Sequence, residues 1–383
     1  MTRENCFITP FGKLILERYP LEKHNPLRAW NAADELLLEQ INTEQLLQQP
    51  TSKILIINDA SGALTLPLLH TRDNLEITCW SDSYLCQRGI EENLSRNGLS
   101  PDSLHFLPST SPPAKTYNMV LMQVPKTRSL LEYQLHQLKS RLCPGTPIIA
   151  GAMVKHLQGS FIECFEKVIG PTHTSLAKKK ARLIFSTLDT TLAPNSLADN
   201  TSYPLERWPL TLVNLCNVFS RQKLDIGTRF FLPHLDSNHE KVKTIFDLGC
   251  GNGALGIAAG HLNPTASIHF FDESYLAVKS AQLSFEANKL ENPARYKTTD
   301  CLDGVQQKAD LILCNPPFHQ SNTIHIGIAL RMFKQARRHL NPGGQLRIVG
   351  NRHLNYHIHL KKTFPKVRQL DANKKFVILQ ASI

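Results

Sequence analysis

Several features that would assign this chain to a particular class of protein are missing from its 383 residues. No apolar run reaches the ~18 residues that a membrane helix needs, and the N-terminus lacks the apolar core and cleavage site of a secretory signal. None of the nine cysteines forms a Cys-x-x-Cys pair, so the usual zinc spacing is absent. His353, His357 and His359 have no acidic residue among them. We therefore expect a cytoplasmic protein with buried thiols, no metal and no membrane partner.

Acidic residues are also fewer than basic ones. The chain has 43 lysines and arginines against 32 acidic residues, a net charge of +11. Hydrophobic residues at 42% and charged residues at 20% are typical of globular proteins, which excludes a disordered or fibrous chain. The length indicates two domains. The basic balance favours a polyanionic partner such as nucleic acid over a charge kept for solubility alone.

The chain contains an internal repeat. Residues 54–64 (ILIINDASGAL) match residues 245–255 (IFDLGCGNGAL) in length, apolar run and ending. Further matches follow in the same order: 83–85 with 274–276, 119–126 with 311–318, 142–145 with 340–343, and 178–185 with 374–379. We interpret the chain as two fused copies of one domain, at 1–190 and 211–383, joined by a proline- and asparagine-containing linker at 191–210.

Each copy alternates short apolar runs with longer helical patterns. In the second copy we expect strands near 243–248, 267–272, 294–299, 310–314, 345–350 and 375–381. Helices are expected near 254–261, 275–289, 323–340 and 354–363. This alternation predicts a mostly parallel sheet covered on both faces. The fold class is therefore α/β, with two tandem Rossmann-like domains that form an internal pseudo-dimer.

A glycine-rich turn follows the first of these strands. Gly249, Gly251 and Gly253 let the backbone approach a ligand where a Cβ would clash, and the helix that follows begins with free N–H groups. Asp272 ends the next strand, where an acidic residue accepts hydrogen bonds from a ribose diol. This pattern leaves NAD and S-adenosylmethionine both open.

A second motif, Asn315-Pro316-Pro317-Phe318, follows the fourth strand. Two prolines stop the strand and leave carbonyl groups outside the sheet. The asparagine oxygen and a neighbouring carbonyl can accept both hydrogens of a planar amino group, which frees its lone pair for methylation. Phe318 offers a face on which a flipped base can stack. The motif favours S-adenosylmethionine over NAD.

These residues resemble the S-adenosylmethionine-dependent amino-methyltransferases of the methyltransferase small-domain superfamily. With the degenerate first copy and the basic charge, the chain is most similar to the bacterial ribosomal RNA guanine 2-amino methyltransferases, and to the large-subunit (23S) enzymes more than the small-subunit (16S) ones. The segments that carry this resemblance are 25–30 (NPLRAW), 32–35 (AADE), 124–127 (VPKT), 179–183 (KKARL), 217–221 (NVFSR) and 224–227 (LDIG).

The resemblance implies a role for each motif. The loop from Asp247 to Gly253 would hold the methionine part of the cofactor, Asp272 its ribose hydroxyls and Asp300 its adenine amino group. The segment 219–229, with Asp225 and Gly227, would cover the cofactor, and residues 315–318 would hold the guanine. Neither a metal nor a covalent intermediate is implied.

The first copy lacks both the cofactor-binding glycines and the motif expected to hold the guanine. Gly249 and Gly251 are replaced by Asn58 and Ala60, and the Asn-Pro-Pro-Phe motif by Gln123-Val124-Pro125-Lys126. A domain that keeps its apolar strands without a site suggests substrate binding. We expect its cations to contact RNA, although a charge run is more often a solvated turn; the candidates are Lys126, Arg128, Lys178, Lys179, Lys180 and Arg182.

Two other functions are compatible with parts of the sequence. An amino-methyltransferase acting on DNA adenine or protein glutamine shares the acceptor chemistry, but usually has tyrosine in place of Phe318. A NAD-dependent oxidoreductase rests on the glycine turn and leaves the second motif unexplained. Because the chain already contains a pseudo-dimer, we expect it to act as a monomer.

Overall fold

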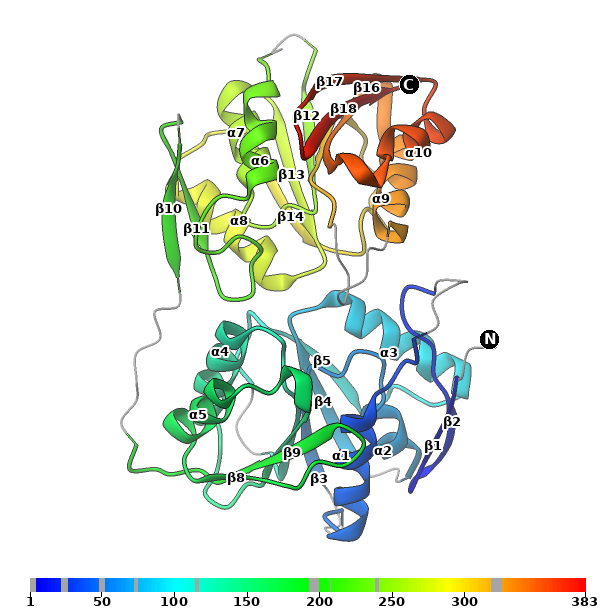
Figure 1. Cartoon of the computed structure of the whole chain (residues 1–383), viewed down its shortest axis with the longest axis vertical. Helices are drawn as coiled ribbons and strands as arrows, with labels where there is room; N and C mark the ends of the chain where they lie inside the picture. The colour runs from blue at the N-terminus through cyan, green and yellow to red at the C-terminus, as the bar shows by residue number, and fades with distance from the viewer. Residues whose placement is uncertain are drawn as a thin grey trace. The chain divides into compact units, whose positions relative to one another are not determined.

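The computed structural model describes residues 5–21, 27–47, 52–71, 75–113, 117–192, 200–206, 208–237, 241–317 and 326–383. The chain divides into two compact units, Met1–Ala198 and Asp199–Ile383. In each unit, helices cover a seven-stranded sheet (Figure 1). No helix among these described residues is long and apolar enough to cross a membrane.

The sheet of the second unit has the order β14-β13-β12-β15-β16-β18-β17. Its strands are β12 (Thr244–Leu248), β13 (Ser267–Asp272), β14 (Ala294–Thr298), β15 (Ala309–Cys314), β16 (Leu340–Asn351), β17 (Lys366–Ala372) and β18 (Phe376–Ser382). The first five are parallel and β18 runs antiparallel to both of its neighbours. The carboxyl ends of the parallel strands therefore share one edge, where ligands of such sheets bind.

Helices cover both faces of this sheet. One apolar core lies under α6 (Ile226–Phe231), α7 (Ala254–Leu262) and α8 (Tyr275–Ala287). The other lies under α9 (Gly327–Arg338) and α10 (Tyr356–Thr363). Short 3₁₀ turns occur at η2 (Leu232–His234) and η3 (Arg352–Leu354), and the hairpin of β10 (Thr201–Leu205) and β11 (Leu210–Asn214) packs on α8.

The first unit repeats this arrangement with the order β5-β4-β3-β6-β7-β9-β8. Its strands are β3 (Ser52–Ile57), β4 (Leu75–Ser81), β5 (Leu104–Pro108), β6 (Met119–Gln123), β7 (Ile148–Met153), β8 (Thr172–Thr174) and β9 (Ala181–Ser186). Its helices are α1 (Ala32–Thr43), α2 (Thr65–Thr71), α3 (Tyr84–Asn97), α4 (Arg128–Lys139), α5 (Gly159–Val168) and the turn η1 (Val154–His156), and a hairpin of β1 (Cys6–Thr9) and β2 (Gly12–Ile15) precedes them.

The strand registers confirm the internal duplication. Ile54 pairs with Ile77 in the first unit as Ile245 pairs with Ile268 in the second. These are the residues that the sequence match places at equivalent positions. The predicted α/β fold class with two Rossmann-like copies is confirmed.

Most of the elements expected in the second copy are present with small shifts at their ends. The sequence did not indicate β17, whose composition KVRQLDA is polar because it is an edge strand with little buried surface. It also did not indicate α6, whose six residues are too few for a periodic pattern. Part of the expected linker, Thr201–Leu205, forms strand β10.

A buried polar network closes the carboxyl edge of the sheet in the first unit. Asn31 and Asp34 form a capping box at the start of α1, and Gln123 at the end of β6 donates to Asp34 Oδ1. The side chain of Asn58 exchanges hydrogen bonds with Gln134 at 2.9 and 2.8 Å. Burial, and then the nearby charge of Asp59, raises the pKa of Asp34 to about 7.

This pKa predicts how the stability of the first unit depends on pH. Between pH 4 and 7 the folded chain holds a proton on Asp34 that the unfolded chain has lost, so the free energy of unfolding falls as pH rises through this window. Asp34→Asn keeps an acceptor for the capping bond and cannot ionise. We expect it to be more stable than the wild type at pH 8 by a few kcal/mol, since one pKa unit corresponds to about 1.4 kcal/mol.

Denaturant titrations followed by the fluorescence of Trp30 and Trp80, both buried in this unit, measure the effect. Glu44→Gln, at the exposed end of the same helix, is the control and should leave the pH profile unchanged. Parallel profiles for the wild type and Asp34→Asn would contradict the prediction.

Candidate active site

The glycine-rich loop connects β12 to α7 at the carboxyl edge of the second sheet. Gly249, Gly251 and Gly253 have φ angles of +73°, +54° and +82°, in the left-handed region that disfavours side chains. The N–H groups of Gly249 and Cys250 donate to the carbonyl of Phe271 at 2.8 and 2.9 Å. The loop is therefore anchored to β13, and its shape favours glycine.

Asp272, at the end of β13, lies against this loop. Its Oδ2 accepts from the Gly251 N–H at 2.9 Å, and its Oδ1 accepts from the Ser274 N–H at 3.1 Å. Desolvation raises the pKa of Asp272, while these backbone hydrogen bonds oppose that rise. The carboxylate is held in one orientation, and each oxygen keeps a further lone pair that could accept a ribose hydroxyl.

Asp247 lies beneath the loop. It is 1% exposed, and its Oδ2 accepts from the Gly256 N–H at 2.8 Å. Burial raises the pKa of Asp247 to about 8. Because it accepts from Gly256, its side chain faces the first turn of α7. Its contribution to cofactor binding stays a prediction.

Asp300 follows β14 and is buried. Its Oδ1 forms an ion pair of 2.7 Å with Arg331 Nη2 of α9. Arg331 thus orients one oxygen of the carboxylate that we expect near an adenine amino group.

Asn315, which directly follows β15, is held through its amide nitrogen. Its Nδ2 donates to Asp225 Oδ2 and to Thr228 Oγ1, both at 3.0 Å. Because a carboxylate only accepts, the nitrogen of the amide must face Asp225. The Oδ1 of Asn315 is buried and has no hydrogen-bond partner among the described residues. Such an orphaned acceptor is costly unless a ligand supplies a donor.

The residues that hold Asn315 come from the start of α6. Asp225 is the N-cap of this helix, and its Oδ2 also accepts from the Thr228 N–H at 2.8 Å. A Cβ on Gly227 would lie 2.9 Å from that oxygen, so glycine leaves room for the carboxylate. Asp225 and Gly227, which we expected near the cofactor, are thus brought together with Asn315.

The rest of the second motif is only partly described. Pro316 is buried and Pro317 is exposed. Phe318 lies outside the described residues, so its expected stacking role stays a prediction.

Sequence reasoning missed two contributors to this site. Thr228 gave no signal, because a threonine in a short helix has no distinguishing pattern. Asn252 also holds the glycine loop, since its Nδ2 donates to Tyr203 Oη at 3.0 Å and to Asn214 Oδ1 at 2.8 Å. Both partners lie in the β10–β11 hairpin, more than 35 residues away in sequence, so only the fold reveals the contact.

The equivalent loop of the first unit is filled by its own side chains. Asn58, with φ of +63°, occupies the position of Gly249 and donates to the Gln123 carbonyl at 3.0 Å. The carboxylate of Asp59 accepts from four successive N–H groups at 2.9 to 3.1 Å, those of the turn residues Gly62, Ala63 and Leu64 and of Thr65, the first residue of α2. The backbone donors that could meet a ligand are therefore already used.

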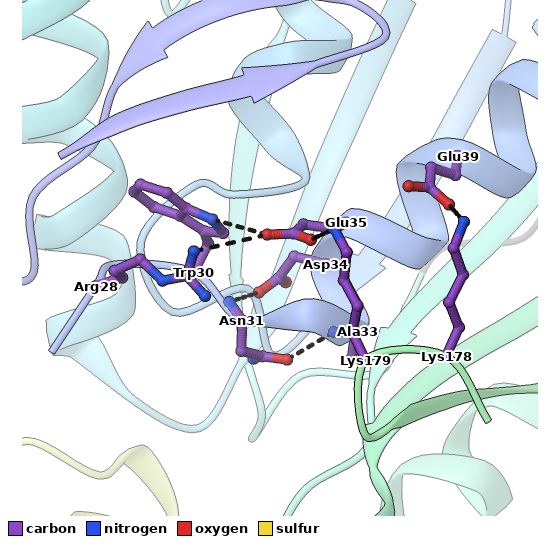
Figure 2. A network of polar contacts seen from close by, with 9 residues as sticks. All are labelled: Arg28, Trp30, Asn31, Ala33, Asp34, Glu35, Glu39, Lys178 and Lys179. Carbon is purple, nitrogen blue, oxygen red and sulfur yellow. Dashed lines mark hydrogen bonds and ion pairs between the residues drawn. The ribbon is translucent and has the colours of Figure 1, made fainter. Parts of the chain in front are cut away.

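Two of the lysines that we expected to contact RNA form ion pairs within the first unit (Figure 2). Lys178 Nζ lies 2.6 Å from Glu39 Oε2, and Lys179 Nζ lies 2.6 Å from Glu35 Oε2. Lys179 and Lys180 have φ angles of +51° and +63° and form the tip of a tight hairpin, as in a type I′ turn. The run is thus a turn between strands, and its RNA contact stays a prediction.

The other basic candidates of the first unit differ in their surroundings. Arg128 pairs with Glu132 at 2.9 Å. Lys180 and Lys126 are exposed, and within the described residues neither pairs with a carboxylate. Arg182 is partly buried in β9, and its Nε has no partner there. Lys126 and Lys180 are therefore the better-placed candidates for phosphate contact.

Two family models match the chain, and together they span most of it. Residues 4–190 match the RLMG N-terminal domain, and residues 209–380 match the methyltransferase small domain. These ranges follow the two units of the structure.

Comparisons with individual proteins agree with the family models. The chain is 46% identical to ribosomal RNA large subunit methyltransferase G of Pseudomonas paraeruginosa, over 98% of this chain and 99% of that protein. The same protein of Ectopseudomonas mendocina is also 46% identical with the same coverage. Among solved structures, the Thermus thermophilus ("T. Thermophilus") 16S rRNA N2 G1207 methyltransferase, in complex with AdoMet and guanosine, covers 100% of both chains with a TM-score of 0.76 and 21% identity. The last likeness is one of fold. From its identity to these relatives over nearly its whole length, the chain belongs to the ribosomal RNA large subunit methyltransferase G family.

Proposed function

We propose that the chain transfers a methyl group from S-adenosylmethionine to the 2-amino group of one guanine in large-subunit (23S) ribosomal RNA. The observation that carries the proposal is Asn315 Oδ1, a buried acceptor with no donor in the described part of the chain, fixed in place through Asp225 and Thr228. The names of the 46% identical relatives support the large subunit as the substrate. Such a substrate implies work in the cytoplasm, and we propose a monomer as the active species.

The residues fit the cofactor. The glycine loop, with its positive φ angles, brings backbone N–H groups to the carboxyl edge, and Asp272 holds a carboxylate beside it. We propose that Gly249, Gly251 and Gly253 bind the methionine part and Asp272 the ribose hydroxyls. When bound, S-adenosylmethionine supplies an electrophilic methyl group.

The chemistry that the protein contributes is acceptor placement. The lone pair of a guanine amino group is delocalised into the ring, so the amine is a poor nucleophile. Asn315 Oδ1 and an adjacent backbone carbonyl would accept its two hydrogens and draw the nitrogen toward tetrahedral geometry. Its proton becomes acidic only after the methyl group has been gained and then leaves to water, so no strong base is required.

The alternatives are separable by substrate. A DNA adenine or protein glutamine target would use the same acceptors, and the 16S target of the Thermus enzyme is a guanine amine as well. A hydride-transfer enzyme would leave the Asn315 acceptor without a use.

Mass spectrometry of ribosomal RNA from a strain lacking the protein tests the proposal. We expect one methylguanine to be missing from 23S RNA, and the purified protein with labelled S-adenosylmethionine to restore it there. A missing methyl group in 16S RNA, or labelling of DNA or protein alone, would overturn the assignment.

We predict that the chain binds one S-adenosylmethionine. The first unit replaces two loop glycines by Asn58 and Ala60 and saturates its helix N-terminus with Asp59. Titration calorimetry should give a stoichiometry of one. A value of two would show that the first unit keeps a working site.

Asn315→Ala should abolish methyl transfer and leave cofactor affinity nearly unchanged. Loss of a preorganised hydrogen-bonding group costs about 100-fold or more in rate. Thr228→Val removes one of the two bonds that orient the amide and should cost only about fivefold. Single-turnover rates measure both variants, and near-normal turnover of Asn315→Ala would place the acceptors elsewhere.

Asp272→Ala should instead weaken cofactor binding. Charge-assisted hydrogen bonds contribute about 1.5–3 kcal/mol each, so the Kd should rise at least about tenfold. Ser81→Ala, at the equivalent position of the first unit, is the matched control and should bind as the wild type does. Equal affinity of the Asp272 variant would place the ribose at another residue.

A further inference from the structure

Two segments of the second unit carry cations at the same sheet edge as Asn315. Arg352 lies in η3, directly after β16, and Lys374 and Lys375 lie in the turn before β18. β16 runs parallel to β15, with Ile348 paired to Cys314. Asn351 at the end of β16 pairs with the first residue of β18. The η3 turn and the β17–β18 turn therefore lie next to each other, η3 one strand and the β17–β18 turn two strands away from Asn315.

Hydrogen bonds join these two segments. The Arg352 N–H donates to the Lys375 carbonyl at 2.9 Å, and Arg352 Nη1 donates to the Asn373 carbonyl at 3.1 Å. The Asn373 Oδ1 accepts from the N–H groups of Lys375 and Phe376 at 2.8 and 2.7 Å. The turn is thus a built structure that presents its lysines in a defined direction.

The charges of this cluster are not neutralised within the unit. Arg352, Lys374 and Lys375 are exposed, and across the described ranges no carboxylate pairs with any of them. The outer face of α10 continues the positive surface, because its buried side is formed by Tyr356 and Leu360. The further exposed basic residues are His353, His357, Lys361 and Lys362.

Lys375 is connected to the acceptor site by packing. Its Nζ lies 5.1 Å from the centroid of the Phe376 ring. That ring is buried, and a Cβ built on Gly227 would lie 3.4 Å from its Cε1 and 2.9 Å from Asp225 Oδ2. The turn lies two strands away from Asn315 and three residues beyond its level in the register, so strand spacing and rise place it roughly 14 Å from Asn315. A short stretch of RNA that holds its target base at Asn315 would therefore bring its neighbouring phosphates within reach of these lysines.

The equivalent turn of the first unit shows the opposite arrangement. There Lys178 and Lys179 are neutralised by Glu39 and Glu35 of α1 (Figure 2). Glu35 stands four residues after the N-cap of its helix, and the same position after the Asp225 N-cap in α6 is Arg229. At the position of Glu35 the second unit therefore has a cation in place of a carboxylate.

We propose that Arg352, Lys374 and Lys375 form a phosphate clamp that holds the RNA backbone next to the target guanine. The partner is a phosphodiester chain, because unpaired, compact cations at a base-acceptor site complement it and phosphate contacts orient a nucleic acid without selecting bases. The clamp rests on the proposed function, since it assigns RNA handling to the same site.

The test compares full-length variants in filter binding to 23S ribosomal RNA across a range of salt concentrations. Lys374→Ala with Lys375→Ala should lower RNA affinity about tenfold or more at physiological salt, and should flatten the slope of log affinity against log salt by about 1.5–2 units. S-adenosylmethionine affinity, measured by calorimetry, should not change. Lys374→Arg with Lys375→Arg keeps both charges and should retain the slope.

Lys241→Ala with Lys243→Ala is the matched control. These lysines are exposed at the opposite, amino edge of the same sheet, so the variant loses the same net charge away from the site. An equal loss of RNA affinity in both double variants would overturn the clamp in favour of a general charge effect, and so would an unchanged slope in the Lys374/Lys375 variant. Methylation of the same 23S RNA by the wild type is measured separately with labelled S-adenosylmethionine. If the wild type methylates it, either result refutes the clamp alone and leaves the proposed function standing.

Discussion

The hydrogen bonds that Asn315 donates to Asp225 and Thr228 are the constraint on which the site depends. They join the end of a central strand to the start of a six-residue helix that precedes the whole sheet in sequence. Because Asp225 accepts from the amide nitrogen, it sets the orientation of the amide and leaves the amide oxygen as an acceptor without a donor among the described residues. The same carboxylate caps α6, so the residue that begins this helix also orients the Asn315 amide.

The two units show how one fold loses a site without losing its structure. Both keep an amide at the end of the equivalent strand that donates to the N-terminus of a helix, Gln123 to Asp34 in the first and Asn315 to Thr228 in the second. In the first unit, Asn58 and Asp59 then use the remaining donors and acceptors. The first unit thus satisfies these polar groups with hydrogen bonds of its own.

The positive charge of the chain is not distributed as a run of lysines would suggest. The densest run, residues 178–180, is partly neutralised by α1, whereas the shorter run at 374 and 375 has no such partner among the residues of the second unit that the structure describes. Net charge predicts a class of partner, but the exposed field at a given place depends on which carboxylates the fold brings near. Surface ion pairs of this kind contribute little to stability. They nevertheless determine which cations remain available to a negatively charged ligand.

The sequence by itself determined the fold class, the duplication and the two motifs, because these depend on apolar periodicity, on glycine at loop positions and on a short contiguous segment. The strands of the two seven-stranded sheets repeat in one order, and the matches at 54–64 and 245–255 begin in the equivalent strands β3 and β12. Only the tertiary structure decided which atoms of the motifs are available. Asp225 and Asn315 are 90 residues apart, and Lys179 and Glu35 are 144 residues apart, so no local pattern reports that one pair orients an acceptor and the other cancels a charge. Hydrogen bonds and ion pairs act over a few ångströms. Whether two groups come within that distance depends on the folding of the whole chain, which the residues at the two positions do not determine.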